Sequence, residues 1–322
     1  MSLLAALVLP AVTGPLPDAS WQNASALAKE VAGHRSSPVS AARPLPCSRT
    51  YRLWRLKNRT GDHGSPDAIV HIPKDFHPAR GVRLVIYNHG LTNTVDETLR
   101  IWRLGRHMTG APPGAVLVVP EWAANPHEYS SEAGPFHNPG FFRRMLVEIM
   151  SKVPELRATR LDDVEEIAIV AYSGGFRAAA SEIYRNGLEQ KIASLTLLDA
   201  LYVTDHFDAW LKRNIRQLAS NRKQYHNFFF DTERQSAAQY QRLRQMLQSA
   251  GLKTTAALYA ANRPKTVLSA AQLSRHGIVY KHTTLTSPRL TPHQLVADVY
   301  FPLAMRAWNY RTGAAPRLAL AK

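Results

Sequence analysis

The segment from residue 166 to residue 180 limits the possible folds of this 322-residue chain more than any other, and it reads Glu-Ile-Ala-Ile-Val-Ala-Tyr-Ser-Gly-Gly-Phe-Arg-Ala-Ala-Ala. Its first six residues, Glu166–Ala171, are nearly all apolar, which predicts a strand buried on both faces of a sheet. Its last five residues are rich in alanine and favour a helix. Because a Ser-Gly-Gly turn joins the two, the segment predicts the strand–turn–helix junction of an α/β protein.

Beyond residue 50, short apolar runs alternate with longer amphipathic stretches. The predicted strands are Tyr51–Leu56, Ala68–Ile72, Arg83–Asn88, Ala115–Pro120, Glu166–Ala171, Ser194–Leu198, Tyr225–Phe230 and Gly277–Lys281. The predicted helices are Val95–His107, Phe141–Val153, Phe176–Gly187, Phe207–Asn221, Glu233–Ser249 and Gln294–Trp308, the last kinked or shortened by Pro302. This alternation indicates a mostly parallel, eight-stranded, doubly wound sheet with helices on both faces, and its first two strands, with no helix between them, should pair antiparallel.

Residues 1–46 are predicted to be an apolar leader followed by a flexible arm, with a single domain over residues 47–322. The run Leu3–Val12 is too short to cross a membrane but is as long as the core of a signal peptide. The first basic residue is Lys29, so the positive segment that normally precedes such a core is missing. We therefore expect either export, to the periplasm or the medium, or a cytoplasmic protein.

Ser173 stands where a strand turns sharply into a helix, which is the setting of the nucleophile elbow Gly-x-Ser-x-Gly. The serine of an elbow has a strained backbone, so the residues two positions before and after it must be small. Here Gly175 keeps the second glycine, and Ala171 replaces the first. Two alternatives stay open: a strand–glycine–helix junction without chemistry, and a phosphate-binding turn, although the glycine spacing of such turns is absent.

A second buried strand ends in residues suited to binding a negatively charged oxygen. The run Leu84–Asn88 leads directly into His89-Gly90-Leu91. Two backbone N–H groups aimed at one point stabilise the oxyanion of a tetrahedral intermediate. The candidates are the N–H groups of Leu91 and of Gly174, the residue after the serine. The alternative is that Gly90 is only a turn glycine that ends the strand.

Together, Asn88-His89-Gly90-Leu91 and Ala171-Tyr172-Ser173-Gly174-Gly175 resemble motifs of the α/β-hydrolase fold serine hydrolases, an esterase- and lipase-like superfamily. The resemblance extends over roughly residues 50–310. It implies the α/β-hydrolase fold and a catalytic triad in the chain order nucleophile, acid, histidine. The motifs are typical of the fold and select no substrate.

The resemblance implies an acid after the sixth or the seventh strand. Asp199 ends the apolar run Ser194–Leu198 and is preferred, since pancreatic-type lipases of this superfamily are similar. Asp231 ends the next strand, which is the more common position in the family, and is the alternative acid. Asp205 and Asp208 are expected in the first turn of the next helix, where carboxylates interact favourably with the helix dipole.

The base should follow the last strand. The candidates are His276, His282 and His293, of which His276 precedes that strand. His293 comes after Thr291, a suitable N-cap, and Pro292, a suitable first helical residue. The positive end of the helix dipole favours the neutral imidazole that a general base needs, and the catalytic histidine of the family is similarly placed. His293 is therefore preferred, with a surface-capping role as its alternative. His282, at the end of the strand, is the second candidate base.

These residues predict a serine hydrolase that forms an acyl-enzyme. Ser173 attacks an acyl carbonyl, His293 takes its proton, and Asp199 orients the imidazole. The expected substrate is a small or polymeric ester, most simply a carboxylic ester, or an amide. No cofactor or metal is expected, and Cys47, as the only cysteine, excludes an intramolecular disulfide and a thiolate metal cluster.

The substrate pocket is predicted from residues near the two motifs and in the loop after Pro120. The predicted lining residues are His89, Gly90, Trp122, Tyr172 and Phe176. Trp122 lies in the loop Glu121–Tyr129, between Pro120 and Pro139, and loops above the sheet set specificity in this fold. The alternative is that the aromatic residues only pack this loop onto the sheet.

The chain carries 40 Lys+Arg against 24 Asp+Glu, a formal charge of +16. Part of this charge gathers in residues 209–223, which hold five basic residues and no acidic one. The run is interpreted as a solvated helix face, or else as a contact for an anionic surface such as membrane lipid or cell-wall polymer. The second interpretation gives an alternative function, a catalytically silent hydrolase-fold protein that binds an anionic partner. No nucleic-acid partner is expected, since few aromatic residues lie among the basic ones, and the sequence specifies no oligomeric state.

Overall fold

The structure, a computed structural model, describes residues 47–61, 63–74, 76–78, 81–125, 133–260 and 265–313. All of these residues belong to one compact unit, Arg35–Lys322. The leader and arm predicted for residues 1–46, and residues 126–129 of the predicted pocket loop, lie outside the described residues, so export and the domain boundary stay predictions. Within the described ranges, no helix has the length and apolarity needed to cross a membrane.

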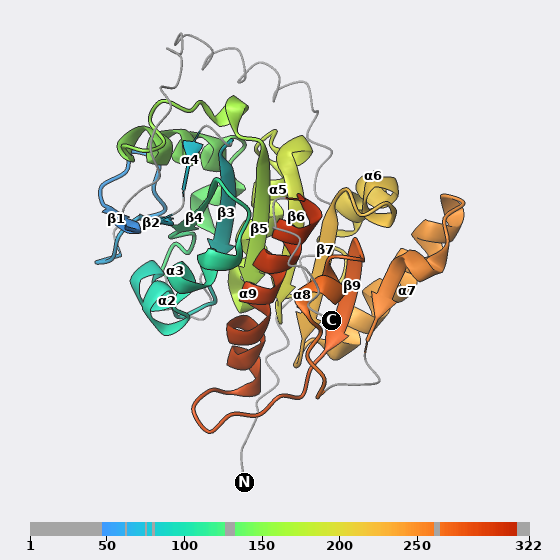
Figure 1. The fold of residues 1–322 in the computed structure, drawn as a ribbon. Coiled ribbons are helices and arrows are strands. Elements are labelled where there is room, and N and C mark those ends of the chain that lie inside the picture. Colours follow the sequence, from blue (N-terminus) through green and yellow to red (C-terminus); the bar gives the residue numbers. More distant parts are fainter. Residues whose placement is uncertain are drawn as a thin grey trace, which may run out of the picture. The chain divides into compact units, whose positions relative to one another are not determined.

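A nine-stranded sheet forms the centre of this unit, in the order β1-β2-β4-β3-β5-β6-β7-β9-β8 (Figure 1). Its strands are β1 (Arg49–Leu53), β2 (Ala68–Ile72), β3 (Arg83–Asn88), β4 (Ala115–Pro120), β5 (Glu166–Tyr172), β6 (Ile192–Leu198), β7 (Gln224–Phe229), β8 (Ala257–Tyr259) and β9 (Ile278–His282). β2 pairs antiparallel with both β1 and β4, and every other pair is parallel. The antiparallel opening and the mostly parallel sheet are confirmed. The predicted number of strands is wrong by one, because β8 has only 3 residues and shows no pattern of its own.

Helices cover both faces of the sheet, which explains why its central strands are apolar without interruption. The helices are α2 (Val95–Ile101), α3 (Leu104–His107), α4 (Phe141–Lys152), α5 (Phe176–Tyr184), α6 (Asp208–Ala219), α7 (Glu233–Ser249), α8 (Ala270–Leu273) and α9 (Pro292–Arg311). In β3, Leu84 and Ile86 pack into one hydrophobic core with α4, α5, α6 and α7. Val85 and Tyr87 point the other way, into a second core with α2, α3, α8 and α9. The strand order and the two helical layers confirm the predicted α/β-hydrolase fold (Figure 1).

Two helices differ from the sequence prediction. The stretch Val95–His107 is not one helix, because Arg103 has a left-handed backbone (φ 49°) and separates α2 from α3. α9, predicted to run from Gln294 to Trp308 with a kink or a shortening at Pro302, is not shortened and continues to Arg311. Phe301 and Met305, on either side of this proline, are buried in the second core, so tertiary packing stabilises the helix against the lost backbone hydrogen bond.

We predict that the free energy of unfolding declines from pH 6.5 to pH 4 because of His226, which lies in β7 without exposed surface. Burial lowers the pKa of His226 from 6.5 to about 4. In this range the unfolded chain binds a proton that the folded chain does not, so the stability present above pH 6.5 is lost as the pH falls, on the order of 3 kcal/mol in total. Urea unfolding at pH 7.5, 5.5 and 4.5 should show a smaller decline for His226→Gln than for the wild type.

The same substitution at His77, a partly exposed histidine, is the control for this experiment. It should leave the decline with pH as it is in the wild type. An equal decline in the wild type and in His226→Gln would contradict the prediction.

Candidate active site

The predicted elbow forms at the end of β5. A single 3₁₀ turn, Ser173–Gly175, follows the strand directly, and α5 begins at the next residue. Ser173 has a φ of 49°, in the left-handed region that an L-residue occupies only when its surroundings hold it there. Ala171, two residues earlier, is fully buried. The strained backbone expected of a nucleophile elbow is therefore present.

Two glycines let the turn after β3 pack directly against this elbow. A Cβ atom on Gly175 would overlap the carbonyl oxygen of Asn88, the last residue of β3. A Cβ atom on Gly90 would lie 3.2 Å from the Cβ of Ser173. Backbone thus meets backbone at this point, and larger residues would push the two turns apart.

The predicted oxyanion donors, the N–H groups of Leu91 and Gly174, belong to these two adjoining turns. A Cβ atom on Gly174 would overlap the side chain of Leu91, so the two residues are in direct contact. Within the described part of the chain, neither N–H donates to a backbone carbonyl in a turn, loop or helix cap.

His293 lies in the first turn of α9, as the sequence predicts. The predicted N-cap is confirmed: the Gln294 N–H donates to Thr291 Oγ1 at 3.2 Å, and the Thr291 N–H donates to Gln294 Oε1 at 3.0 Å. This capping box, with Pro292 as the first helical residue, fixes where the helix begins. It therefore fixes the position of the histidine relative to the helix axis.

The far end of α9 is tied to the strand that carries the elbow. Trp308 Nε1 and Arg311 Nη2 both donate to Glu166 Oε2, at 2.9 and 2.7 Å. Glu166 is the first residue of β5, at the end opposite Ser173. The helix of the histidine and the strand of the serine are thus joined by polar contacts.

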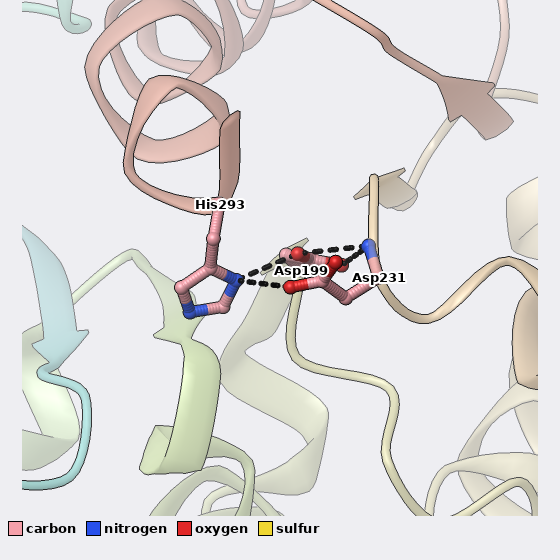
Figure 2. A group of neighbouring side chains, drawn as sticks. All are labelled: Asp199, Asp231 and His293. Carbon is pink, nitrogen blue, oxygen red and sulfur yellow. Dashed lines mark hydrogen bonds and ion pairs between the residues drawn. The ribbon is translucent and has the colours of Figure 1, made fainter. Parts of the chain in front are cut away.

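His293 and Asp199 form a hydrogen bond although 94 residues separate them. His293 Nδ1 lies 2.6 Å from Asp199 Oδ2, and Nε2 is on the side of the ring away from both carboxylates (Figure 2). The ring of Tyr172, the residue before Ser173, lies 5.0 Å from the His293 ring between centroids. Ser173 Oγ forms no hydrogen bond with another described residue. The hydrogen bond between a catalytic serine and its base is often long or poorly aligned before substrate binds.

Asp199 is a buried carboxylate held by the residues that follow β7. It has no exposed surface, and its own backbone is left-handed, with a φ of 48°. It accepts hydrogen bonds of 3.0–3.1 Å from the N–H groups of Phe230, Asp231 and Thr232 and from the Thr232 hydroxyl. Burial acts to raise the pKa of Asp199, but the contact with His293 and the N–H groups outweigh it, so the pKa lies below the ordinary value. Asp199 therefore stays ionised beside the histidine.

Asp231, the alternative acid, lies beside the pair without bonding to the histidine. Its Oδ2 is 3.8 Å from His293 Nδ1, and its side chain is 54% exposed. Partial burial and the charge of Asp199 raise the pKa of Asp231. Asp199, Asp231 and His293 are close enough together to ligate a metal ion. The carboxylate oxygens of Asp199 already accept hydrogen bonds from three N–H groups and a hydroxyl and contact His293. They are therefore poorly available to a metal ion.

His282, the second candidate base, lies apart from this group. It ends β9, where its ring stacks on Phe229 with 5.4 Å between centroids. Its Nδ1 is 3.8 Å from Glu233 Oε1. The structure therefore brings His293, and not His282, to Asp199.

The predicted pocket residues divide into two groups. Gly90, Tyr172 and Phe176 lie at the elbow, and the two aromatic residues keep 4% and 7% exposure. His89 and Trp122 have no exposed surface, and Trp122 Nε1 donates to the His89 carbonyl oxygen at 2.9 Å. The prediction that these two residues line the pocket is wrong, because they pack beneath the turn after β3.

Sequence reasoning missed Tyr202, an exposed aromatic residue near the elbow. Tyr202 is 41% exposed, and its ring lies 5.9 Å from the Phe176 ring between centroids. It follows Asp199 by three residues. The signal in the sequence is an aromatic residue three positions after the predicted acid.

The basic run 209–223 does not form one exposed face. Lys223 is buried, since it directly precedes β7. Its Nζ donates to the Glu189 carbonyl oxygen at 3.2 Å. Arg213 Nε lies 2.7 Å from Glu189 Oε1. Other exposed cations of the run are Lys212, Arg216 and Arg222. The interpretation of the whole run as one solvated face is therefore corrected.

No protein-family model matches the chain, and no curated protein is similar to it in sequence. Solved structures are similar to it in fold. A mutant of the feruloyl esterase module from Clostridium thermocellum, complexed with sinapinate, is 12% identical, with 86% of this chain and 94% of that chain covered and a TM-score of 0.48. An esterase from the archaeon Pyrobaculum calidifontis is 13% identical, with 91% and 89% covered and a TM-score of 0.43. With TM-scores below 0.5 these likenesses carry no argument. The α/β-hydrolase fold is defined here by the strand order and the elbow of this chain.

We predict that Gly175→Ala destabilises the protein, because the added Cβ overlaps the carbonyl oxygen of Asn88 and backbone must move. The expected loss in the free energy of unfolding is about 1–3 kcal/mol, as for other overpacked sites. Urea unfolding measures it. Ser173→Ala, which removes one oxygen from the same turn, is the matched control and should unfold like the wild type. A Gly175→Ala protein as stable as this control would argue against the close approach.

Proposed function

We propose that the protein is a serine hydrolase that cleaves a carboxylic ester, or an amide, through Ser173, His293 and Asp199. The observation that carries the proposal is the 2.6 Å contact between His293 Nδ1 and Asp199 Oδ2 near the strained turn of Ser173. A serine, an imidazole and an ionised carboxylate on loops at one edge of a sheet are what nucleophilic acyl transfer requires.

Each group has a role that follows from its chemistry. Because His293 Nδ1 donates to Asp199, Nε2 is free to take the proton of Ser173 as its oxygen attacks the acyl carbonyl. The N–H groups of Leu91 and Gly174 hold the oxyanion of the tetrahedral intermediate. His293 then protonates the leaving group, and water cleaves the acyl-enzyme with the same residue as base.

The alternative, a catalytically silent protein that binds an anionic partner through a basic face, has less support. Lys223 is buried and Arg213 is paired with Glu189, so the run that suggested such a face is interrupted. The aromatic residues Phe176 and Tyr202 near the elbow support instead a substrate with an apolar group.

We predict that a fluorophosphonate probe labels the protein at Ser173, because the proposed base activates this hydroxyl and the proposed oxyanion donors stabilise the phosphonyl oxygen. Ser173→Ala should abolish the labelling and the hydrolysis of p-nitrophenyl esters. Ser151→Ala, a change at an exposed serine, is the control and should leave both as in the wild type. Intact-mass spectrometry and an absorbance assay give the two readouts. A wild type that is neither labelled nor active would refute the proposed function.

We predict that Asp199→Asn lowers kcat by about 10³-fold or more, because the amide no longer stabilises the imidazolium. Asp231→Asn should lower kcat by no more than about threefold, since its carboxylate forms no hydrogen bond with His293 and its backbone N–H remains. Steady-state kinetics with a p-nitrophenyl ester compare the two. Loss of activity only in Asp231→Asn would show that Asp231 is the acid.

A further inference from the structure

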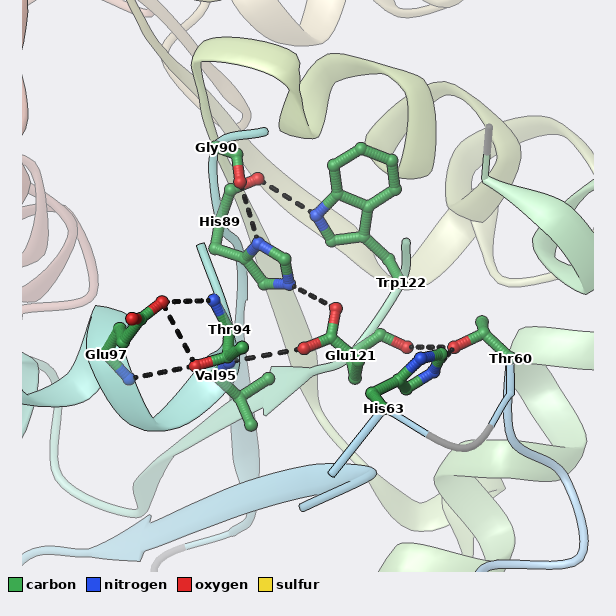
Figure 3. Close-up of polar contacts among 9 residues, drawn as sticks. All are labelled: Thr60, His63, His89, Gly90, Thr94, Val95, Glu97, Glu121 and Trp122. Carbon is green, nitrogen blue, oxygen red and sulfur yellow. Dashed lines mark hydrogen bonds and ion pairs between the residues drawn. The ribbon is translucent and has the colours of Figure 1, made fainter. Parts of the chain in front are cut away.

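His89 and Glu121 form a polar pair inside the protein, next to the turn that carries one proposed oxyanion donor (Figure 3). His89 directly follows β3, and Glu121 directly follows β4. His89 Nε2 lies 2.8 Å from Glu121 Oε1, and both side chains are 0% exposed. Because neither side chain reaches solvent, the pair does not contact a substrate directly. Its role therefore depends on the backbone groups to which it is hydrogen-bonded.

The imidazole ring of His89 holds the peptide unit between Gly90 and Leu91. His89 Nδ1 lies 2.9 Å from the Gly90 carbonyl oxygen, which accepts a hydrogen bond from an Nδ1–H. Because a peptide unit is planar and trans, the direction of the Gly90 C=O fixes the opposite direction of the Leu91 N–H. That N–H is the one proposed to bind the oxyanion.

Glu121 in turn holds the ring. Its Oε1 faces His89 Nε2, its Oε2 accepts a hydrogen bond from the Val95 N–H at 3.3 Å, and its carbonyl oxygen accepts one from Thr60 Oγ1 at 3.0 Å (Figure 3). Both ring nitrogens of His89 thus face acceptor oxygens, which favours a doubly protonated ring. Burial acts to lower the pKa of His89, but Glu121 and the Gly90 carbonyl outweigh it and raise the pKa.

A buried charged pair seldom stabilises a fold more than apolar residues of the same size would. Stability is therefore a weak reason for the His89–Glu121 pair. Its place directly beneath the turn points to a different role, because it fixes the orientation of one backbone N–H.

We propose that His89 and Glu121 are positioning residues that aim the Leu91 N–H at the carbonyl oxygen of the substrate. His89 holds the Gly90–Leu91 peptide, and Glu121 holds His89. The inference rests on the proposed hydrolase function and deepens it. Since an oxyanion donor acts more strongly in the transition state than in the ground state, misdirecting it lowers kcat and changes KM little.

Two substitutions at His89 separate the two contacts of its ring. The amide nitrogen of Asn reaches about as far as Nδ1, and that of Gln about as far as Nε2. His89→Asn therefore keeps a donor for the Gly90 carbonyl, whereas His89→Gln keeps only the contact with Glu121. With a p-nitrophenyl ester we expect kcat to fall by about 10²-fold in His89→Gln and by about tenfold or less in His89→Asn, with KM within about threefold in both.

Two substitutions at Glu121 form a second matched pair. In Glu121→Gln the amide oxygen accepts from the Val95 N–H and the amide nitrogen donates to His89 Nε2, so Nδ1–H stays on the Gly90 carbonyl and kcat should stay within about tenfold. Glu121→Leu removes both contacts and should lower kcat by about 10²-fold. Urea unfolding of all four variants ensures that kcat is compared between folded proteins.

The outcomes separate this proposal from the proposed function. Equal kcat values for His89→Asn and His89→Gln, a change in KM alone, or a Glu121→Gln protein as slow as Glu121→Leu would overturn the positioning role. If His89→Gln does not fold, the two Glu121 variants decide. A wild type that neither reacts with the fluorophosphonate nor cleaves esters refutes the hydrolase function itself.

Discussion

Direct contact between the turn after β3 and the turn after β5 is the constraint on which the site depends. Gly175 lies against the carbonyl oxygen of Asn88, and Gly90 lies against the Cβ of Ser173. Only residues without side chains allow two backbones to approach so closely. Ser173, whose φ is 49°, lies at this contact. The strained serine and the two proposed oxyanion donors therefore belong to the same pair of adjoining turns.

Most of the fold could be predicted from the sequence because its strands are buried on both faces. β2, β3 and β4 begin and end at the predicted residues, since continuous apolar runs mark a strand of this kind. β8 and α8 were missed because elements of 3 and 4 residues show no periodicity. The break between α2 and α3 depends on one left-handed residue, Arg103, which no pattern marks.

The candidate site could be predicted less completely, because sequence shows which residues end a strand but not which atoms they use. Both Asp199 and Asp231 follow strands, yet Asp199 contributes a carboxylate to His293 and Asp231 contributes mainly a backbone N–H to Asp199. In the same way, the aromatic and polar residues after β4 suggested a pocket. Trp122 turns inward because its indole N–H satisfies a buried carbonyl oxygen, a requirement that only the folded backbone reveals.

Glu166 contacts Trp308 and Arg311 at the far end of α9. These two residues therefore help to hold the helix that carries His293. α9 has 20 residues and is therefore about 30 Å long, with His293 at one end and Trp308 and Arg311 at the other. β5 carries Glu166 at its first residue and leads into Ser173. Helix and strand are thus joined by two hydrogen bonds, one of them also an ion pair, at the ends opposite His293 and Ser173. Shortening the chain before residue 308 would remove these contacts, so the alignment of the proposed base with the proposed nucleophile depends in part on side chains at the opposite end of the helix.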